Sequence, residues 1–145
     1  MRERVIVLVE DNANDEELTL RAFRKSNIVN RVVVVRDGAE ALDYFFCRGV
    51  HANRLSSEIV QLVLLDLKLP KIGGLDVLRA LRADERTRLI PIVILTSSAE
   101  DQDLLRGYGL GANSYVRKPV DFGQFVESVR QLGLYWLVIN QAAPG

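Results

Sequence analysis

The feature of this sequence that most constrains its fold is a set of five short apolar runs, each followed by a segment with helical spacing. The first four runs are rich in valine, isoleucine and leucine and do not alternate with polar residues, which is typical of parallel strands buried on both faces. Strands of this kind need helices on both sides of their sheet. The runs are Val5–Val9, Val32–Val35, Leu62–Leu65, Ile92–Leu95 and Tyr115–Val116.

The helical segments begin at paired residues with the spacing of a capping box, in which two side chains satisfy early backbone N–H groups. Apolar residues then recur at helical spacing, as at Leu75, Leu78 and Leu81, and predict a face that packs on the sheet. Strand and helix therefore alternate five times, which predicts an α/β fold with an open five-stranded parallel sheet and helices on both faces. The capping pairs are Asn14 with Glu17, Asp37 with Glu40, Ser98 with Asp101 and Asp121 with Gln124.

Length and composition fit one soluble domain over residues 1–145, with no room for a separate output domain. Nineteen basic residues balance nineteen acidic ones, so we expect neither nucleic acid nor a membrane surface as a partner. No apolar run approaches the roughly 18 residues of a membrane span, and no signal-peptide layout follows Met1, which favours the cytoplasm. The single cysteine, Cys47, lies in an apolar run and is predicted to be a buried thiol. The link from Cys47 to Gln61 is longer than such folds require.

Candidate site residues stand just after four of the five predicted strands. Glu10 and Asp11 follow the first strand, Asp66 the third, Thr96 the fourth and Lys118 the fifth. In open α/β sheets, ligands bind outside the carboxyl ends of the strands. Three carboxylates, a hydroxyl and an ammonium are therefore predicted to meet at one edge of the sheet.

This set of groups needs additional positive charge. Two carboxylates about 4 Å apart repel by about 4 kcal/mol at an effective dielectric constant near 20, and one lysine does not neutralise three acids. Mg²⁺ prefers oxygen ligands, so Glu10, Asp11 and Asp66 are candidate metal ligands. Thr96 and Lys118 are candidate donors to the oxygens of a phosphoryl group in transfer. Asp66 is then the candidate nucleophile, because a carboxylate can form an aspartyl phosphate.

The set Glu10-Asp11, Asp66, Thr96 and Lys118-Pro119 resembles the receiver domain of bacterial two-component signalling, which has a flavodoxin-like (βα)5 fold. Thirty residues separate Asp66 from Thr96 and twenty-two separate Thr96 from Lys118, as in receivers. The resemblance extends from residue 5 to about residue 135. It implies a phosphohistidine on a sensor histidine kinase as the donor and Mg²⁺ as the cofactor. It also implies that the Lys68 backbone carbonyl is a metal ligand and that Tyr115 is a switch aromatic. The chain is then a phosphoacceptor that assists its own phosphotransfer and dephosphorylation, and not an enzyme with a separate substrate.

Two features look like the small response regulators that partner bacterial phytochromes, which are light-sensing histidine kinases. One is the long Cys47–Gln61 link, and the other is an extended last helix with an apolar end, Leu134–Ile139. One helical face does not bury six consecutive apolar side chains, so this end predicts a homodimer built on the fourth helix, the fifth strand and the fifth helix. In the alternative, Gly133 ends the helix and the remainder folds back on the sheet. The residues predicted at the dimer interface are Tyr135, Trp136, Leu137 and Val138.

Other functions fit the residues less well. A haloacid-dehalogenase-type phosphatase needs a second acid two residues after its aspartate, where Lys68 stands. A flavodoxin-like cofactor binder needs a phosphate-cradling loop after the first strand, where Glu10 and Asp11 would repel a phosphate. The glycines at 107, 109 and 111 lie at a predicted helix end and are typical of a C-cap. An adaptor with an inactive acceptor site is disfavoured by the complete residue set. Two kinds of output stay open: a binding switch, and a carrier that passes its phosphoryl group to a histidine phosphotransfer protein.

Overall fold

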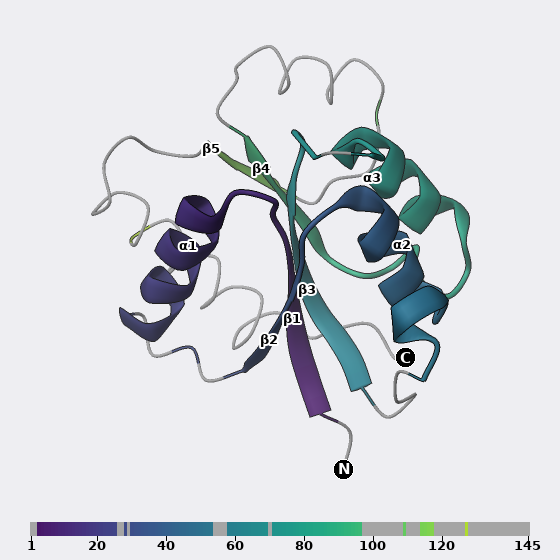
Figure 1. The fold of residues 1–145 in the computed structure, drawn as a ribbon, viewed down its shortest axis with the longest axis horizontal. Helices are drawn as coiled ribbons and strands as arrows, with labels where there is room; N and C mark the ends of the chain where they lie inside the picture. Colours follow the sequence, from purple (N-terminus) through teal and green to yellow (C-terminus); the bar gives the residue numbers. More distant parts are fainter. Residues whose placement is uncertain are drawn as a thin grey trace.

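The computed structural model describes residues 3–25, 28, 30–53, 58–69, 71–96, 109, 114–117 and 127. Its five strands form one parallel sheet in the order β2-β1-β3-β4-β5 (Figure 1). This is the predicted sheet of the receiver fold. The strands are β1 Glu3–Val9, β2 Arg31–Val35, β3 Glu58–Asp66, β4 Ile92–Thr96 and β5 Ser114–Arg117. The helices are α1 Ala13–Lys25, α2 Gly38–Phe45, the short 3-10 helix η1 Gly49–His51 and α3 Gly74–Ala83.

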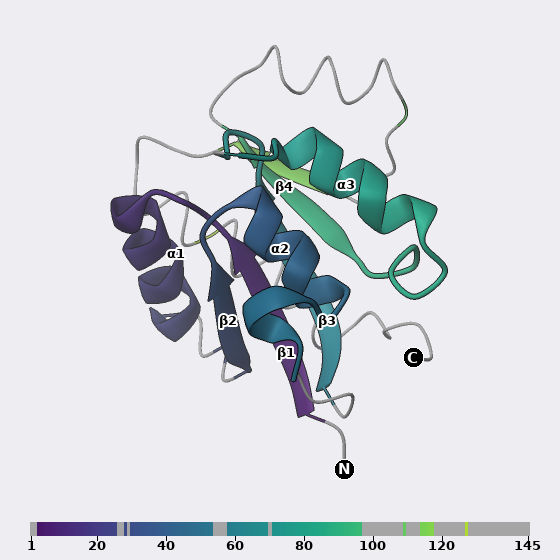
Figure 2. The same ribbon diagram turned by 45° about the vertical axis from the view of Figure 1, so that its right-hand side comes forward.

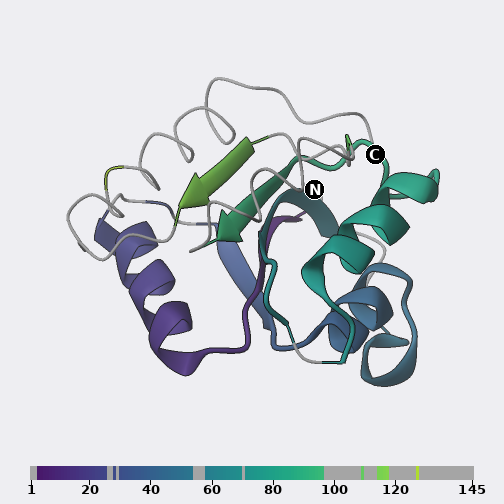
Figure 3. The same ribbon diagram turned by 90° about the horizontal axis from the view of Figure 1, so that it is seen from above.

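Helices cover both faces of the sheet, as the uniformly apolar strands predict. α1 lies on one face, and α2 and α3 lie together on the other (Figures 1 and 3). Alternate residues of β1 supply the two cores: Val5, Val7 and Val9 pack with α2 and α3, while Ile6 and Leu8 pack with α1. All five side chains are fully buried. The carboxyl end of β1 is therefore held by packing on two sides.

β2 departs from the prediction of burial on both faces. It pairs only with β1 and forms an edge of the sheet, so Val35 alone of its residues is buried. β3 starts at Glu58 and not at Leu62, because its pairing with β1 continues to Glu3. A register shift within this pairing admits one extra residue: Val5 pairs with Val60, and Ile6 pairs with Leu62. The side-chain amide of Asn30 donates a hydrogen bond to the buried extra residue, Gln61, at 3.3 Å.

Part of the long link after α2 folds back along that helix, as Figure 2 shows. The His51 ring of η1 meets Tyr44 edge to face, and its Nε2 lies 3.1 Å from Glu40 Oε2. The prediction of a buried Cys47 is wrong, because the thiol is exposed. α2 ends at Phe45, and Cys47 has a φ of 54° in the turn that follows, so the helical spacing no longer directs its side chain to the core.

Two predicted helix starts lie within the described residues, and one of them is corrected. α1 begins at Ala13, so the capping residue is Asn12 and not Asn14: Asn12 Oδ1 accepts from the Asp15 N–H at 3.0 Å. Asp37 caps α2 as predicted, because its Oδ1 accepts from the Glu40 N–H at 2.7 Å. The pairs at 98–101 and 121–124 lie outside the described residues. Within the described part of the chain, none of the helices has the length and apolar character that crossing a bilayer requires.

Asp37→Ala is expected to lower the free energy of unfolding by about 1 kcal/mol at neutral pH, the usual contribution of an N-cap. The Glu40 backbone N–H, followed by the Lys71 ammonium, lowers the pKa of Asp37 below 3.8. A lowered pKa gives stability that is present above the unfolded pKa and is lost as the pH falls through the folded one. Denaturant unfolding at pH 7 and in strong acid measures the difference. An equal loss at both pH values contradicts the ionised cap.

Candidate functional site

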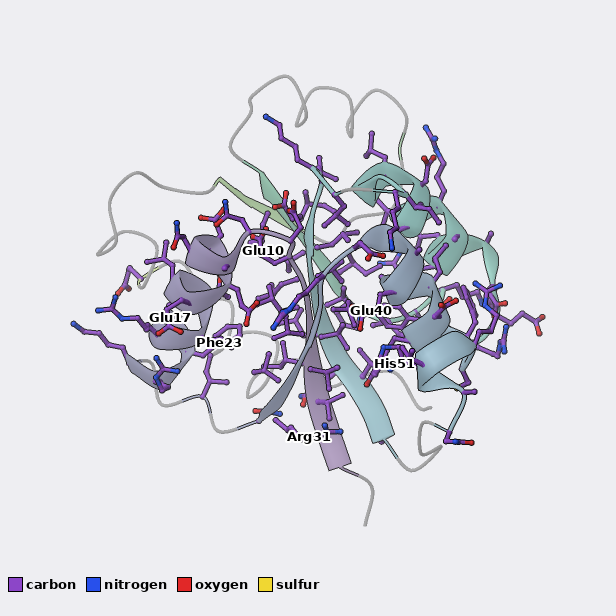
Figure 4. All side chains as sticks on the ribbon, in the orientation of Figure 1. Glu10, Glu17, Phe23, Arg31, Glu40 and His51 are labelled. Carbon is purple, nitrogen blue, oxygen red and sulfur yellow. The ribbon has the colours of Figure 1, made fainter. Side chains whose placement is uncertain are left out.

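Three acids meet at the carboxyl edge of the sheet, where the prediction placed them. Val9 of β1 pairs with Leu65 of β3, so the residues that follow them, Glu10 and Asp66, are neighbours. Carboxylate oxygens of Glu10, Asp11 and Asp66 all lie within 4.8 Å of one another. Glu10 is fully buried and Asp66 is 5% exposed, whereas Asp11 faces solvent. Figure 4 shows Glu10 at the end of β1 nearest the start of α1.

The two acids after β1 are held between that strand and α1. The Glu10 N–H donates to the Val35 carbonyl at 3.0 Å and thereby continues the pairing with β2. Glu10 Oε2 accepts from the Asn12 N–H at 3.4 Å. Since the Asn12 side chain also caps α1, the start of this helix and the buried acid are fixed by one residue. The sequence prediction missed Asn12, although an Asn with Asp15 three residues later has the spacing of a cap.

Asp66 is the last residue of β3, where it pairs with Leu95 of β4. Its Oδ1 accepts a hydrogen bond from the Lys68 N–H at 3.0 Å. The Leu67 N–H donates to the Leu95 carbonyl at 3.4 Å, which extends the sheet by one bond past the acid. The Lys68 side chain is exposed. Asp66 is thus held at the centre of the edge, with one carboxylate oxygen oriented by the loop that leaves it.

The donor set fits a hard divalent cation. Three carboxylates supply only oxygen ligands, and two of them are buried, where uncompensated like charges repel more strongly than in water. Mg²⁺ takes one or two protein carboxylates and completes its shell with water or phosphate oxygens. The exposed position of Asp11 leaves one side of the cluster open to solvent.

The other predicted site residues come from β4, β5 and the segments beyond. The backbone places Thr96 at the last position of β4, paired with Arg117, and Tyr115 beside Ile94. The side chains of Thr96 and Tyr115 lie outside what the structure describes. So do Lys118 and the predicted interface residues 135–138. Their roles stay predictions.

Residues 6–130 match the family model of the response regulator receiver domain. The chain belongs to this family. A probable methanogenesis regulatory protein from Methanothrix harundinacea is 41% identical, and the match covers 97% of this chain and 88% of that protein. The solved receiver AtBRR, a bacteriophytochrome response regulator, is 50% identical with a TM-score of 0.80, covering 97% of this chain and 100% of its own.

A third similar protein carries a metal. The response regulator Rcp1 from Synechocystis is 32% identical, with 92% of this chain and 89% of Rcp1 covered. The structure of its Mn²⁺-bound form has a TM-score of 0.85 and covers 97% of this chain and 99% of Rcp1. Receiver domains are signalling proteins that bind a divalent cation in their active site, and the acid cluster of this receiver has the ligands for one.

Proposed function

We propose that this receiver accepts a phosphoryl group on Asp66 from the phosphohistidine of a sensor histidine kinase, with Mg²⁺ bound. The observation that supports this most directly is the cluster of Glu10, Asp11 and Asp66 at the centre of the sheet edge. In the transfer, a carboxylate oxygen of Asp66 forms a bond to phosphorus and the bond from phosphorus to the histidine nitrogen breaks. The leaving imidazole keeps the electron pair and takes up a proton.

The proposed roles follow from the chemistry of each group. Glu10, Asp11, Asp66 and the Lys68 backbone carbonyl hold Mg²⁺, which when bound offsets negative charge on the phosphoryl oxygens. The Lys68 N–H orients the Asp66 carboxylate. The Thr96 hydroxyl and the Lys118 ammonium donate hydrogen bonds to the phosphoryl oxygens. Tyr115 is the switch aromatic, whose side chain changes position when Thr96 binds the phosphoryl group. These roles make the chain a phosphoacceptor that assists its own phosphorylation and dephosphorylation.

The proposed kinase partner is a bacterial phytochrome, because a bacteriophytochrome regulator shares half of its residues with this chain over nearly its whole length. Phosphoryl transfer from such a kinase would take place in the cytoplasm. Output then passes through protein contact, with onward transfer to a histidine phosphotransfer protein as the second candidate. The whole chain, 1–145, acts as one receiver domain with an extended last helix.

Labelled phosphoryl transfer tests the function. We expect the purified chain to take up one phosphoryl group from acetyl phosphate with Mg²⁺ and none with excess EDTA. Profiling against purified histidine kinases, with phytochromes and non-phytochromes compared at short times, then identifies the donor. Failure of every donor, with the protein folded and Mg²⁺ present, contradicts the proposal.

We further propose a homodimer formed by Tyr135, Trp136, Leu137 and Val138. Each large apolar side chain left in water forgoes about 1.5–3 kcal/mol, and a self-complementary patch is most often closed by a two-fold axis. Trp136→Ala with Leu137→Asp is expected to convert a dimer to a monomer in sedimentation velocity. A wild-type chain that is monomeric at high micromolar concentration, phosphorylated or not, contradicts the dimer.

A further inference from the structure

The loop that joins β3 to α3 is pressed against the phosphorylation site at one end. Gly74, the first residue of α3, is buried against the backbone of Asp66 and Leu67. A Cβ at this position would lie 2.6 Å from Leu67 Cα and still nearer to the Asp66 carbonyl oxygen. The Gly74 N–H donates to the Leu67 carbonyl at 3.1 Å. The end of the loop is therefore set by direct contact with Asp66.

A second glycine holds the same loop from a distant part of the chain. Gly38, the first residue of α2, is buried against Ile72. A Cβ at Gly38 would lie 2.7 Å from the Ile72 carbonyl carbon and 2.8 Å from its Cβ, with the carbonyl oxygen nearer still. Side-chain atoms essentially never approach so closely, and the atoms in the way are mainly backbone. An added methyl group at Gly38 must displace the loop or the start of α2.

The ion pair next to this contact is the weaker of the two connections. Asp37 Oδ2 lies 3.5 Å from Lys71 Nζ, and the Lys71 side chain is 68% exposed. Exposed pairs of this kind add about 0–1 kcal/mol. In contrast, the Ile72 backbone lies so close to Gly38 that an additional carbon on Gly38 cannot be accommodated without a shift.

We propose that Gly38 is a positioning residue for the phosphorylation site. The start of α2 contacts Ile72 in the loop between β3 and α3. The same loop carries the Lys68 N–H, which orients Asp66, and it ends at Gly74, which lies against the Asp66 backbone. A methyl group at Gly38 moves this loop and thereby turns the Asp66 carboxylate away from Glu10 and Asp11. The inference rests on the proposed function of Asp66, but its first effect is on the unphosphorylated protein.

Gly38→Ala tests the inference, with Gly73→Ala as the matched control. Gly73 belongs to the same loop, has a φ of −68° and would meet nothing within 4 Å of an added Cβ. Three quantities are measured on full-length protein: hydrogen exchange of the Lys68 and Gly74 amides without metal, the Kd for Mg²⁺ by calorimetry, and the rate of labelling by acetyl phosphate at saturating Mg²⁺. A 1 Å misplacement can cost up to about 100-fold in rate.

We expect Gly38→Ala to raise the Kd for Mg²⁺ and lower the labelling rate about tenfold each, and to speed exchange at both amides, while Gly73→Ala stays within about twofold of wild type. Phe23→Leu in α1, on the opposite face, controls for lost stability. If Gly38→Ala does not fold, Ile72→Ala is used instead: it removes the packing of the same loop residue on the core and is expected to change the three quantities in the same direction.

Unchanged metal affinity and amide protection in Gly38→Ala overturn the inference. The inference is also overturned if Phe23→Leu, at the same Tm as Gly38→Ala, changes the Kd for Mg²⁺, the labelling rate and the amide exchange equally, since these effects would then follow stability alone. A wild-type chain that is never labelled counts against the proposed function instead, and the amide exchange still decides the role of Gly38.

Discussion

Asp66→Asn is expected to accept no phosphoryl group, either from acetyl phosphate or from a kinase that labels the wild-type chain. The amide that replaces the carboxylate has no anionic oxygen to attack phosphorus, and it removes one ligand charge from the metal site. Because Asp66 lies within 4.8 Å of two other carboxylates, losing its charge relieves repulsion and the variant is expected to fold at least as well as wild type. Intact-mass spectrometry measures the labelling, and thermal unfolding measures the stability.

Asp76→Asn is the matched control for this substitution. Asp76 lies in the first turn of α3, and its side chain is 65% exposed and paired with Arg79. Labelling of this control at the wild-type rate ties the loss to Asp66. Stoichiometric labelling of folded Asp66→Asn would show that another residue is the acceptor.

Asp11→Ala is expected to weaken Mg²⁺ binding by about 100-fold or more. Loss of a residue that only hydrogen-bonds to a ligand typically weakens metal binding by about 10–100-fold, and loss of a direct ligand has a larger effect. The stability of the metal-free protein is expected to rise or to stay level, because one negative charge is removed from the cluster. Asp11 is exposed and contributes negative charge to a cluster whose other two members are buried. Thermal melts with and without Mg²⁺ separate the two effects, since a ligand that binds only the folded state raises the Tm.

Glu17→Ala serves as the comparison for Asp11→Ala. Glu17 is an exposed acid of α1 (Figure 4) that pairs with Arg24 at 3.2 Å. Glu17→Ala therefore removes the same charge as Asp11→Ala, but at a position away from the cluster. The same Mg²⁺-induced rise in Tm in wild type and Asp11→Ala would contradict the role of Asp11 as a ligand. A fall in metal-free stability would contradict the repulsion.

The sequence predicted the sheet and the acid cluster because both depend on residue order alone. Apolar runs that do not alternate indicate parallel strands, and the ends of parallel strands share one edge, so the sequence alone predicts that Glu10 and Asp66 lie together. The incorrect predictions concern the burial of β2 and Cys47, which depends on tertiary contacts that a local sequence pattern does not indicate. β2 is less buried than its valines suggest because it is an edge strand. Cys47 is exposed because α2 ends two residues before it.

The contact between Gly38 and Ile72 was not predictable for a related reason. Gly38 and Ile72 are far apart in the sequence, and a glycine at the start of a helix is ordinary by itself. Only the fold shows that its missing side chain leaves room for another backbone. Asn12 is different, because its spacing to Asp15 was readable, and the nearby Asn14 with Glu17 offered a competing and incorrect start.

The extra residue at Gln61 separates the end of β3 that carries Asp66 from the segment that precedes the strand. β3 consists of an outer part that pairs with the start of β1 and an inner part, from Leu62 onward, that carries Asp66. A one-residue slip in a regular strand turns every side chain to the opposite face, but a bulge absorbs the extra residue locally. A change in the length of the connection that follows α2 is therefore expected to leave the alignment of the acids unchanged.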